Sequence, residues 1–428
     1  MRLNRLAVML LASSATLLQA QDVKVNILTE FWYTQMMDNT LRNNAAIKPV
    51  ASAYYEGLSA GRFAENSFNM KRAEIYLNYK ISDEWAGYIM FDPSLTNTSA
   101  AAATATTASG SALQDWVITW TPKAIPGFFA KGGQFKMPTT YESTILSARD
   151  IYFFDRSQMS RIIGERRDRG AMFGYTYGDP KGFKGTFSAA VSNGTTDDGT
   201  SGKTNVDQNA SKDYTVRYDG SFGPAHRFGV YARTGLTNLK YLTTASATIP
   251  ANWTAAGVTQ ADLRNNQDKT TANGFFYAYN RSNFHFDLEY STGLVGRRFP
   301  VNFTAAAAPG REHLDQKFEG YAITGVYIMG QHQVAVRYDM MNYNSGNDWY
   351  GSVNPYAPTT GAYAGSDTAP KYTETTVGYN YNFVPNKYTY GKVKVDYIMR
   401  SKNFLAPNPG STSIVGGNSV VLSVQVGY

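Results

Sequence analysis

Residues 72–81 read Arg-Ala-Glu-Ile-Tyr-Leu-Asn-Tyr-Lys-Ile, so that polar and apolar side chains alternate along most of the stretch. Residues 420–428, Val-Val-Leu-Ser-Val-Gln-Val-Gly-Tyr, have the same period of two. Successive side chains of a β-strand point to opposite faces, so this alternation predicts strands with one apolar and one polar face. The pattern recurs along the chain without a convincing amphipathic helix, which predicts an all-β fold.

About sixteen such strands are predicted, a number within the range of transmembrane β-barrels. Their expected starts lie near Val25, Phe68, Trp85, Gln114, Phe128, Arg169, Gly182, Ser211, Ala225, Ala272, Asn283, Gln316, Gln331, Lys371, Lys387 and Asn418.

Short and long connections alternate between these strands. Seven are short, for example Ser82-Asp83-Glu84 and Gly223-Pro224, and eight are long. The long ones are expected at 39–66, 93–112, 137–168, 194–210, 240–271, 294–315, 344–370 and 401–417. Tight turns on one rim and longer loops on the other are typical of a bacterial outer-membrane barrel. A soluble β-sandwich would also alternate, but it would not sort its loops by rim or place so many aromatic residues on its apolar face.

The composition agrees with an exported barrel. The 428 residues include no cysteine, which excludes disulfides, a thiol nucleophile and thiolate metal sites. Residues 1–20, with Arg2 and Arg5 before an apolar stretch, are predicted to be a signal peptide. No run of about 20 apolar residues follows that could form a transmembrane helix. We therefore expect residues 21–428 to form a single β-barrel domain in the outer membrane.

If the apolar faces meet lipid, the polar faces line a channel, and a sixteen-stranded barrel is wide enough for water. The expected inward-facing basic residues are Arg72, Lys136, Lys184, Arg217, Arg227, Arg233, Arg337, Lys392, Lys394 and Arg400. The expected inward-facing acids are Glu74, Asp115, Asp213, Asp219, Asp287, Glu289, Asp339, Glu374 and Asp396. In four cases a basic residue precedes an acid by two positions: Arg72 and Glu74, Arg217 and Asp219, Arg337 and Asp339, and Lys394 and Asp396. We interpret these as local pairs that neutralise the wall, with a charged track as the alternative.

The third long loop, residues 137–168, stands out by its arginines. Six lie between positions 149 and 169: Arg149, Arg156, Arg161, Arg166, Arg167 and Arg169. Arginine binds phosphate and carboxylate through two parallel hydrogen bonds, and rings of basic residues make pores anion-selective. The loop also contains apolar residues that need a wall to pack on: Ile145, Leu146, Ile151, Phe153, Phe154, Ile162 and Ile163. We predict that it folds into the barrel lumen. The alternative is a surface loop whose arginines pair internally or bind lipopolysaccharide phosphates.

Two stretches carry a family resemblance. Residues 133–138, Gly-Gln-Phe-Lys-Met-Pro, are similar to the GQFK-x-P stretch of the phosphate-selective porin O/P family. Glu142 and residues 150–157, Asp-Ile-Tyr-Phe-Phe-Asp-Arg-Ser, follow at similar spacing, and residues 72–75 and 382–386 are weaker similarities of the same kind. The resemblance implies a trimeric outer-membrane porin whose third loop constricts the pore, with a preference for anions and with phosphate as one candidate among them. Of the candidate pore residues, the resemblance itself implies only Lys136 and Arg156, which lie in the matching motifs.

The sequence thus predicts a porin for passive diffusion of small hydrophilic solutes, with anion preference. The candidate pore and anion-binding residues are Lys136, Arg149, Arg156, Arg161, Arg166, Arg167, Arg169, Lys184, Arg217, Arg337, Lys392 and Lys394. The expected partners are small anions or other hydrophilic solutes, membrane lipid, lipopolysaccharide and two further copies of the chain. No cofactor, metal site or nucleic acid is expected.

Three alternatives remain beside an anion-preferring channel: a non-selective porin, a surface receptor or adhesin barrel, and an outer-membrane enzyme. Catalysis is disfavoured because only His285, with Asp287 and Glu289 on the same face, resembles a site.

Overall fold

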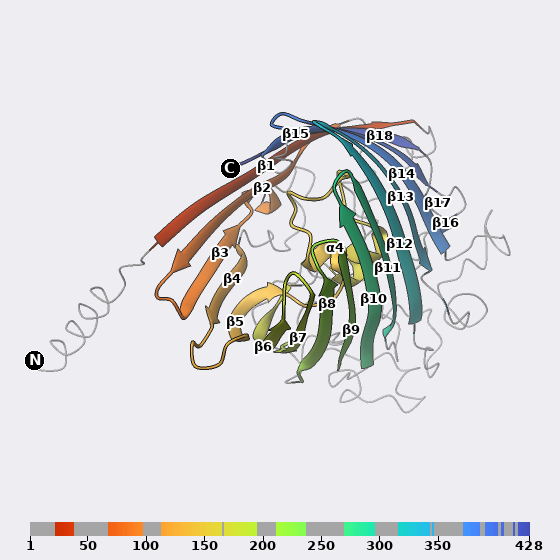
Figure 1. The fold of residues 1–428 in the computed structure, drawn as a ribbon. Coiled ribbons are helices and arrows are strands. Elements are labelled where there is room, and N and C mark those ends of the chain that lie inside the picture. The colour runs from red at the N-terminus through yellow and green to blue at the C-terminus, as the bar shows by residue number, and fades with distance from the viewer. Residues whose placement is uncertain are drawn as a thin grey trace, which may run out of the picture.

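The computed structural model describes residues 22–37, 67–96, 113–164, 167–194, 211–236, 269–295, 316–342, 345, 371–385, 390–400, 404–405, 414–415 and 418–428. Within these ranges, sixteen strands form one closed antiparallel barrel (Figure 1). They are β1 (Asp22–Met36), β2 (Ser67–Lys80), β3 (Trp85–Phe91), β4 (Leu113–Trp120), β5 (Phe128–Lys136), β6 (Arg167–Gly178), β7 (Phe183–Ser192), β8 (Asp213–Phe222), β9 (His226–Leu236), β10 (Lys269–Arg281), β11 (Phe284–Val295), β12 (Gln316–Met329), β13 (His332–Asn342), β14 (Lys371–Asn382), β15 (Gly391–Arg400) and β18 (Ser419–Gly427). The predicted barrel is confirmed, and every strand starts within four residues of its expected position.

Two short strands, β16 (Phe404–Leu405) and β17 (Ile414–Val415), form a separate two-stranded sheet.

The first and last strands close the barrel. β1 pairs with β2 on one side and with β18 on the other, and its Leu28 lies opposite Gly427. The backbone N–H of Ile27 donates to the carbonyl of Tyr428 at 3.0 Å, and the N–H of Tyr428 donates back at 2.8 Å. The closed ring leaves no unpaired strand edge. Figure 1 shows β1 and β18 side by side at this seam.

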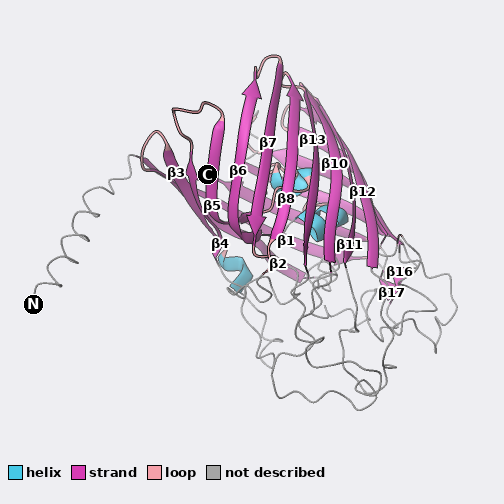
Figure 2. Ribbon diagram, turned by 90° about the horizontal axis from the view of Figure 1, so that it is seen from below, coloured by secondary structure: helices cyan, strands magenta, loops and turns pink. Residues whose placement is uncertain are grey.

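The tight turns gather at one end of the barrel (Figure 2). Two of them depend on glycine: Gly223 between β8 and β9 has φ +56°, and Gly330 between β12 and β13 has φ +61°. A side chain is disfavoured at such angles, so glycine allows the chain to reverse within a few residues. Of the long connections, the structure describes residues 137–164 most fully, and most of the others fall outside its ranges.

The outer face of the barrel is apolar and the inner face is polar. On β13, Val334, Val336 and Tyr338 are exposed, whereas the alternating Arg337 and Asp339 are buried. Apolar side chains cover the outside of the other strands in the same way. This distribution is that of a barrel surrounded by hydrocarbon rather than by water.

A belt of aromatic rings lies on this outer face where strands meet the tight turns. Ring contacts run from Trp85 through Trp120 to Phe128 across β3–β5, with centroid separations of 6.0 and 6.2 Å. A second series joins Tyr177, Phe183, Phe222 and Phe228 across β6–β9. Amphipathic aromatic side chains favour the boundary between hydrocarbon and headgroups, so the belt marks one membrane interface.

Among the described residues, helices are few and short. They are the 3-10 turn η3 (Pro93–Thr96), α4 (Tyr141–Thr144) and the π-helical turn η5 (Ser160–Gly164). In the part of the chain that the structure describes, no helix has the length and apolar character needed to cross a membrane. Figure 1 shows α4 within the ring of strands, and Figure 2 shows helical segments behind the strands and a further helical turn at the end of the barrel near β4.

Candidate functional site

Residues 137–164 connect β5 and β6 and pack against the inner face of the barrel. Three apolar contacts hold the segment at separate places along the wall. Tyr141 stacks on Phe276 of β10 with ring centroids 4.9 Å apart. Phe153 packs on Val326 and Ala335 of β12 and β13.

The third contact is made by Phe154, which packs among Trp32, Ile398 and Val421 of β1, β15 and β18. The side chains of Phe153 and Phe154 are both buried. This burial satisfies the requirement that the apolar residues of the segment find a wall.

Two lysines of β15 bind the main chain of the segment. The Nζ of Lys392 donates to the carbonyls of Arg149 and Ile151 at 3.0 and 2.9 Å. The Nζ of Lys394 donates to the carbonyl of Phe153 at 3.2 Å. Both lysines therefore tie the stretch 149–153 to β15.

Carboxylates on the inner face of the wall accept hydrogen bonds from backbone N–H groups of the same segment. Asp396 of β15 accepts a hydrogen bond from the N–H of Phe154 at 2.6 Å. Asp339 of β13 accepts from the N–H of Gln158. Buried peptide groups need partners, and charged partners form stronger bonds than neutral ones. The wall thus supplies donors for carbonyls and acceptors for N–H groups of the same segment.

Glu289 of β11 plays the same part at the start of α4, where the first N–H groups of a helix have no internal partner. Its carboxylate accepts from the N–H groups of Tyr141 and Glu142.

Arg337 of β13 joins the segment to a buried charge network. Its NH1 donates to the carbonyl of Asp155 at 2.9 Å and lies 3.2 Å from the Glu142 carboxylate. Its NH2 lies 3.5 Å from Glu374 of β14, which also lies 3.4 Å from Arg400 of β15. Burial raises the pKa of Glu142, and the Arg337 charge and the N–H of Ser157 oppose that shift.

The predicted local charge pairs hold in part. Arg217 binds Asp219 through two hydrogen bonds of 2.8 and 2.9 Å, as expected for a pair that neutralises its own strand. Arg72 lies 3.6 Å from Glu74 and also pairs with Glu30 of β1. The charges of the other two pairs bind beyond their own strand. Lys394 pairs with Glu30, while Asp396, Arg337 and Asp339 all bind the 137–164 segment. Strand spacing alone does not reveal these partners, because they come from distant parts of the chain.

The six arginines between positions 149 and 169 have different surroundings. Arg149 donates to the carbonyls of Ile27 and Tyr428 at 3.2 Å, beside the seam of the barrel, and Arg169 donates to Gln134 of β5 at 3.2 Å. Arg156, Arg161 and Arg167 line a common cavity. Arg166 lies outside the described residues. Lys184, predicted on the inner face, is half-buried on β7 and is not among the residues that line this cavity.

This cavity has a volume of about 740 Å³ and lies between the 137–164 segment and the wall formed by β2–β9. Nine basic and four acidic side chains line it, a formal excess of five positive charges. The basic residues are Lys71, Arg72, Lys131, Lys136, Arg156, Arg161, Arg167, Arg217 and Arg227. The acids are Glu74, Asp92, Asp115 and Asp219.

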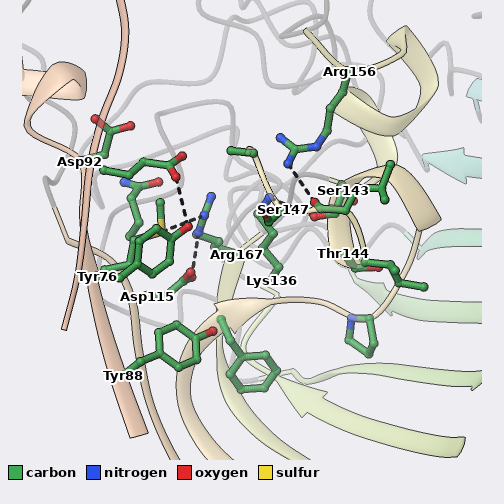
Figure 3. Close-up of a pocket in the computed structure, with 18 of the residues that line it drawn as sticks. Tyr76, Tyr88, Asp92, Asp115, Lys136, Ser143, Thr144, Ser147, Arg156 and Arg167 are labelled. Carbon is green, nitrogen blue, oxygen red and sulfur yellow. Dashed lines mark hydrogen bonds and ion pairs between the residues drawn. The ribbon is translucent and has the colours of Figure 1, made fainter. Parts of the chain in front are cut away.

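Two sides of the cavity differ in character (Figure 3). Tyr76, Tyr88 and Asp115 lie on one side, and Arg156 lies on the other, with Arg167 between them. Arg167 donates from Nε to Asp115 at 2.8 Å, which neutralises that acid. The cavity therefore has tyrosine rings on one side and the guanidinium of Arg156 on the other.

Two cavity lysines were not predicted. Lys71 precedes inward-facing Arg72 and should face outward, but the pairing of β1 and β2 shifts at this residue, since Glu30 pairs with Arg72 and Phe31 with Met70. The extra residue forms a bulge, and bulges redirect side chains. Lys71 accordingly lies 3.1 Å from Asp155.

The predicted alternation of β5 was wrong. The sequence pattern places Lys136 on the inner face, which would turn Lys131 outward. Phe135 packs instead with inner-face residues such as Val117, and Lys131 lines the cavity. Lys136 still reaches the cavity because it ends the strand, and its Nζ donates to the carbonyl of Ser143 at 3.0 Å. Lys136 is the last residue of β5. That terminal position was the one sign in the sequence that its side chain need not follow the alternation of the strand.

The histidine noted in the sequence is paired with its expected acid. His285 Nε2 lies 2.9 Å from Asp287, and its ring lies 5.3 Å from that of Tyr152. Among the described residues, no three histidine or carboxylate side chains are grouped to hold a metal ion.

No protein-family model matches the chain, and no curated protein matches its sequence. Solved structures do match over nearly the whole length. The outer membrane channel DcaP of Acinetobacter baumannii shares 10% identity over 95% of this chain and 97% of its own, with a TM-score of 0.52. An anion-selective porin from Comamonas acidovorans shares 10% identity over 95% of this chain and 99% of its own, with a TM-score of 0.51. The trimer form of OmpT, an outer membrane protein of Vibrio cholerae, shares 10% identity over 95% and 99%, with a TM-score of 0.50. The chain has the fold of outer-membrane porins.

Proposed function

We propose that the chain is an outer-membrane porin that lets small hydrophilic solutes diffuse passively, with a preference for anions. The observation that carries the proposal is the cavity beside the 137–164 segment, which is lined by nine basic and four acidic side chains. A positive lining lowers the energy of an anion in the narrow part of a channel and raises that of a cation. Residues 137–164 would form the constriction, a role supported by their packing on wall residues and by their place in the lining of this cavity.

Export and assembly belong to the same proposal. Residues 1–20 would act as the signal peptide, and the mature barrel would assemble as a homotrimer among lipid and lipopolysaccharide. The porin O/P resemblance adds phosphate as a candidate anion, and the arginines of the cavity suit it because the guanidinium binds phosphate oxygens in pairs. The likeness in fold to an anion-selective porin agrees with this proposal.

Reversal potentials in planar bilayers with a KCl gradient test the anion preference. The sign should correspond to chloride passing more readily than potassium, and phosphate should compete with the chloride current. Replacing Arg161 by Ala should reduce the preference, since Arg161 lines the cavity and shares the Asp155 carboxylate with Lys71, a second cation of the same lining. A potassium preference would refute the anion channel.

A non-selective porin is the second candidate, favoured by the acids of the cavity. Arg217 and Arg167 are each bound to a carboxylate, which reduces their effect on a passing ion. Equal passage of potassium and chloride would support this alternative.

A further inference from the structure

Lys131 on β5 differs from most of its basic neighbours in the cavity. In the described parts of the chain, its Nζ contacts the ring of Phe135 at 4.4 Å from the centroid, and no carboxylate lies within ion-pair distance. Phe135 is itself buried among Val117 and other inner-face residues, so the amine rests on a fixed apolar support. An amine that lacks a carboxylate partner remains available to an anion from the solvent.

Tyr88 on β3 lies on the same support. Its ring packs against the cluster that contains Phe135, and it is half-buried, so that part of the ring faces the cavity (Figure 3). Among the described residues its hydroxyl has no hydrogen-bond partner, whereas the hydroxyl of Tyr76 nearby donates to Glu74 at 3.1 Å. Asp115, an acid of the same cavity lining, is bound by Arg167 at 2.8 Å. The wall thus presents a cation, a hydroxyl and an aromatic face that line one cavity and pack on one cluster.

We propose that Lys131 and Tyr88 form a binding site for flat organic anions, with aromatic carboxylates as the ligand class. The carboxylate accepts hydrogen bonds from the Lys131 amine and the Tyr88 hydroxyl, and the ring of the ligand stacks on Tyr88. Charge-assisted hydrogen bonds and ring stacking each favour such a ligand over a small anion without a ring. The site rests on the proposed anion channel and names the solutes that this channel retains best.

Single-channel recordings with benzoate and acetate as probes test the site, since the two carry the same charge and only benzoate has a ring. Benzoate should interrupt the chloride current at a concentration roughly fivefold lower than acetate. Lys131→Met should raise the benzoate concentration for half-block by roughly tenfold, and Tyr88→Phe, which removes only the hydroxyl, by roughly twofold. Lys181→Met in the exposed turn between β6 and β7 is the matched control and should change nothing.

Equal block by benzoate and acetate would overturn the site, as would unchanged benzoate block in both Lys131→Met and Tyr88→Phe. The second variant keeps the test decisive if the first does not fold. Reversal potentials of the same channels separate this failure from that of the proposed function. A chloride preference without benzoate preference refutes the site alone, and a potassium preference refutes the anion channel on which the site rests.

Discussion

Lys392 on β15 and Lys131 on β5 carry the same amine on the inner face of the same barrel, yet their surroundings differ. Lys392 is buried and binds two main-chain carbonyls of the 137–164 segment. Lys131 lines the open cavity and rests on an aromatic ring. The comparison shows that inward-facing charges in this barrel serve two purposes. On β11–β15, the holding side, most of them bind the segment. On β2–β9, the solute-facing side, the basic residues that line the cavity include Lys71 and Arg217, which also bind the segment.

The largest expected effect concerns the holding side. Arg337→Met removes a cation that lies between Glu142 and Glu374, which are mostly and fully buried respectively. Breaking a buried pair in this way costs about 3 kcal/mol, because a charge is left without its partner. The unfolding temperature of the barrel should fall clearly. It is measured as the temperature at which the protein loses the electrophoretic mobility of its compact folded form.

Arg337→Lys is the matched control, since it keeps the charge but loses the planar fork, and it should fall between the two. Equal melting of Arg337→Met and the wild type would show that the network does not hold the segment.

The next effect concerns one tether of the segment. Asp396→Ala removes the acceptor of the Phe154 N–H, and leaving a buried donor unpaired costs about 1–3 kcal/mol. The segment should loosen locally, which raises the open-channel current noise and the mean conductance in single-channel recordings. Asp396→Asn retains a carbonyl acceptor and should stay close to the wild type. If Ala and Asn variants conduct alike, the hydrogen bond does not position the segment.

The fold could be predicted from the sequence because its signals are local and repeated. The alternation of polar and apolar residues identifies the two faces of each strand, and turns such as Gly223-Pro224 identify where the chain reverses direction. Closure of the sheet follows from the number of strands and the sorting of loop lengths. The one wrong strand face, that of β5, arose where Gly132 and Gly133 interrupt the alternation and leave few side chains to read.

The site could be predicted only in outline. The sequence locates the arginine-rich segment and most inward-facing charges. It cannot tell which charges bind the segment, because contacts such as Lys392 with Ile151 join residues that are 241 positions apart. Lys71 reaches the cavity because β2 bulges at this residue, and the sequence of β2 alone gives no sign of the bulge.

A smaller effect concerns pH. Burial raises the pKa of Glu142 above its ordinary value of 4.5. The folded barrel therefore binds a proton at this residue more readily than the unfolded chain. The resulting contribution to stability is complete below pH 4.5 and is lost as the pH rises through the folded pKa. Glu142→Gln has no carboxyl group to titrate, so its thermal midpoint should depend less on pH in this window. An identical pH dependence in both proteins would exclude Glu142 as its source.

The reversal potentials of Lys131→Met and Lys392→Met, measured in the same KCl gradient, test the two-purpose account most directly. Each variant removes one positive charge from the inner face, and neither leaves a carboxylate that the lysine had bound as an ion pair among the described residues. Lys131→Met should lower the preference for chloride by about twofold, because a partly screened charge near a passing ion contributes a fraction of a kcal/mol to about 1 kcal/mol. Lys392→Met should keep the wild-type reversal potential. An equal or larger shift in Lys392→Met would contradict the division of the wall into a holding side and a solute-facing side.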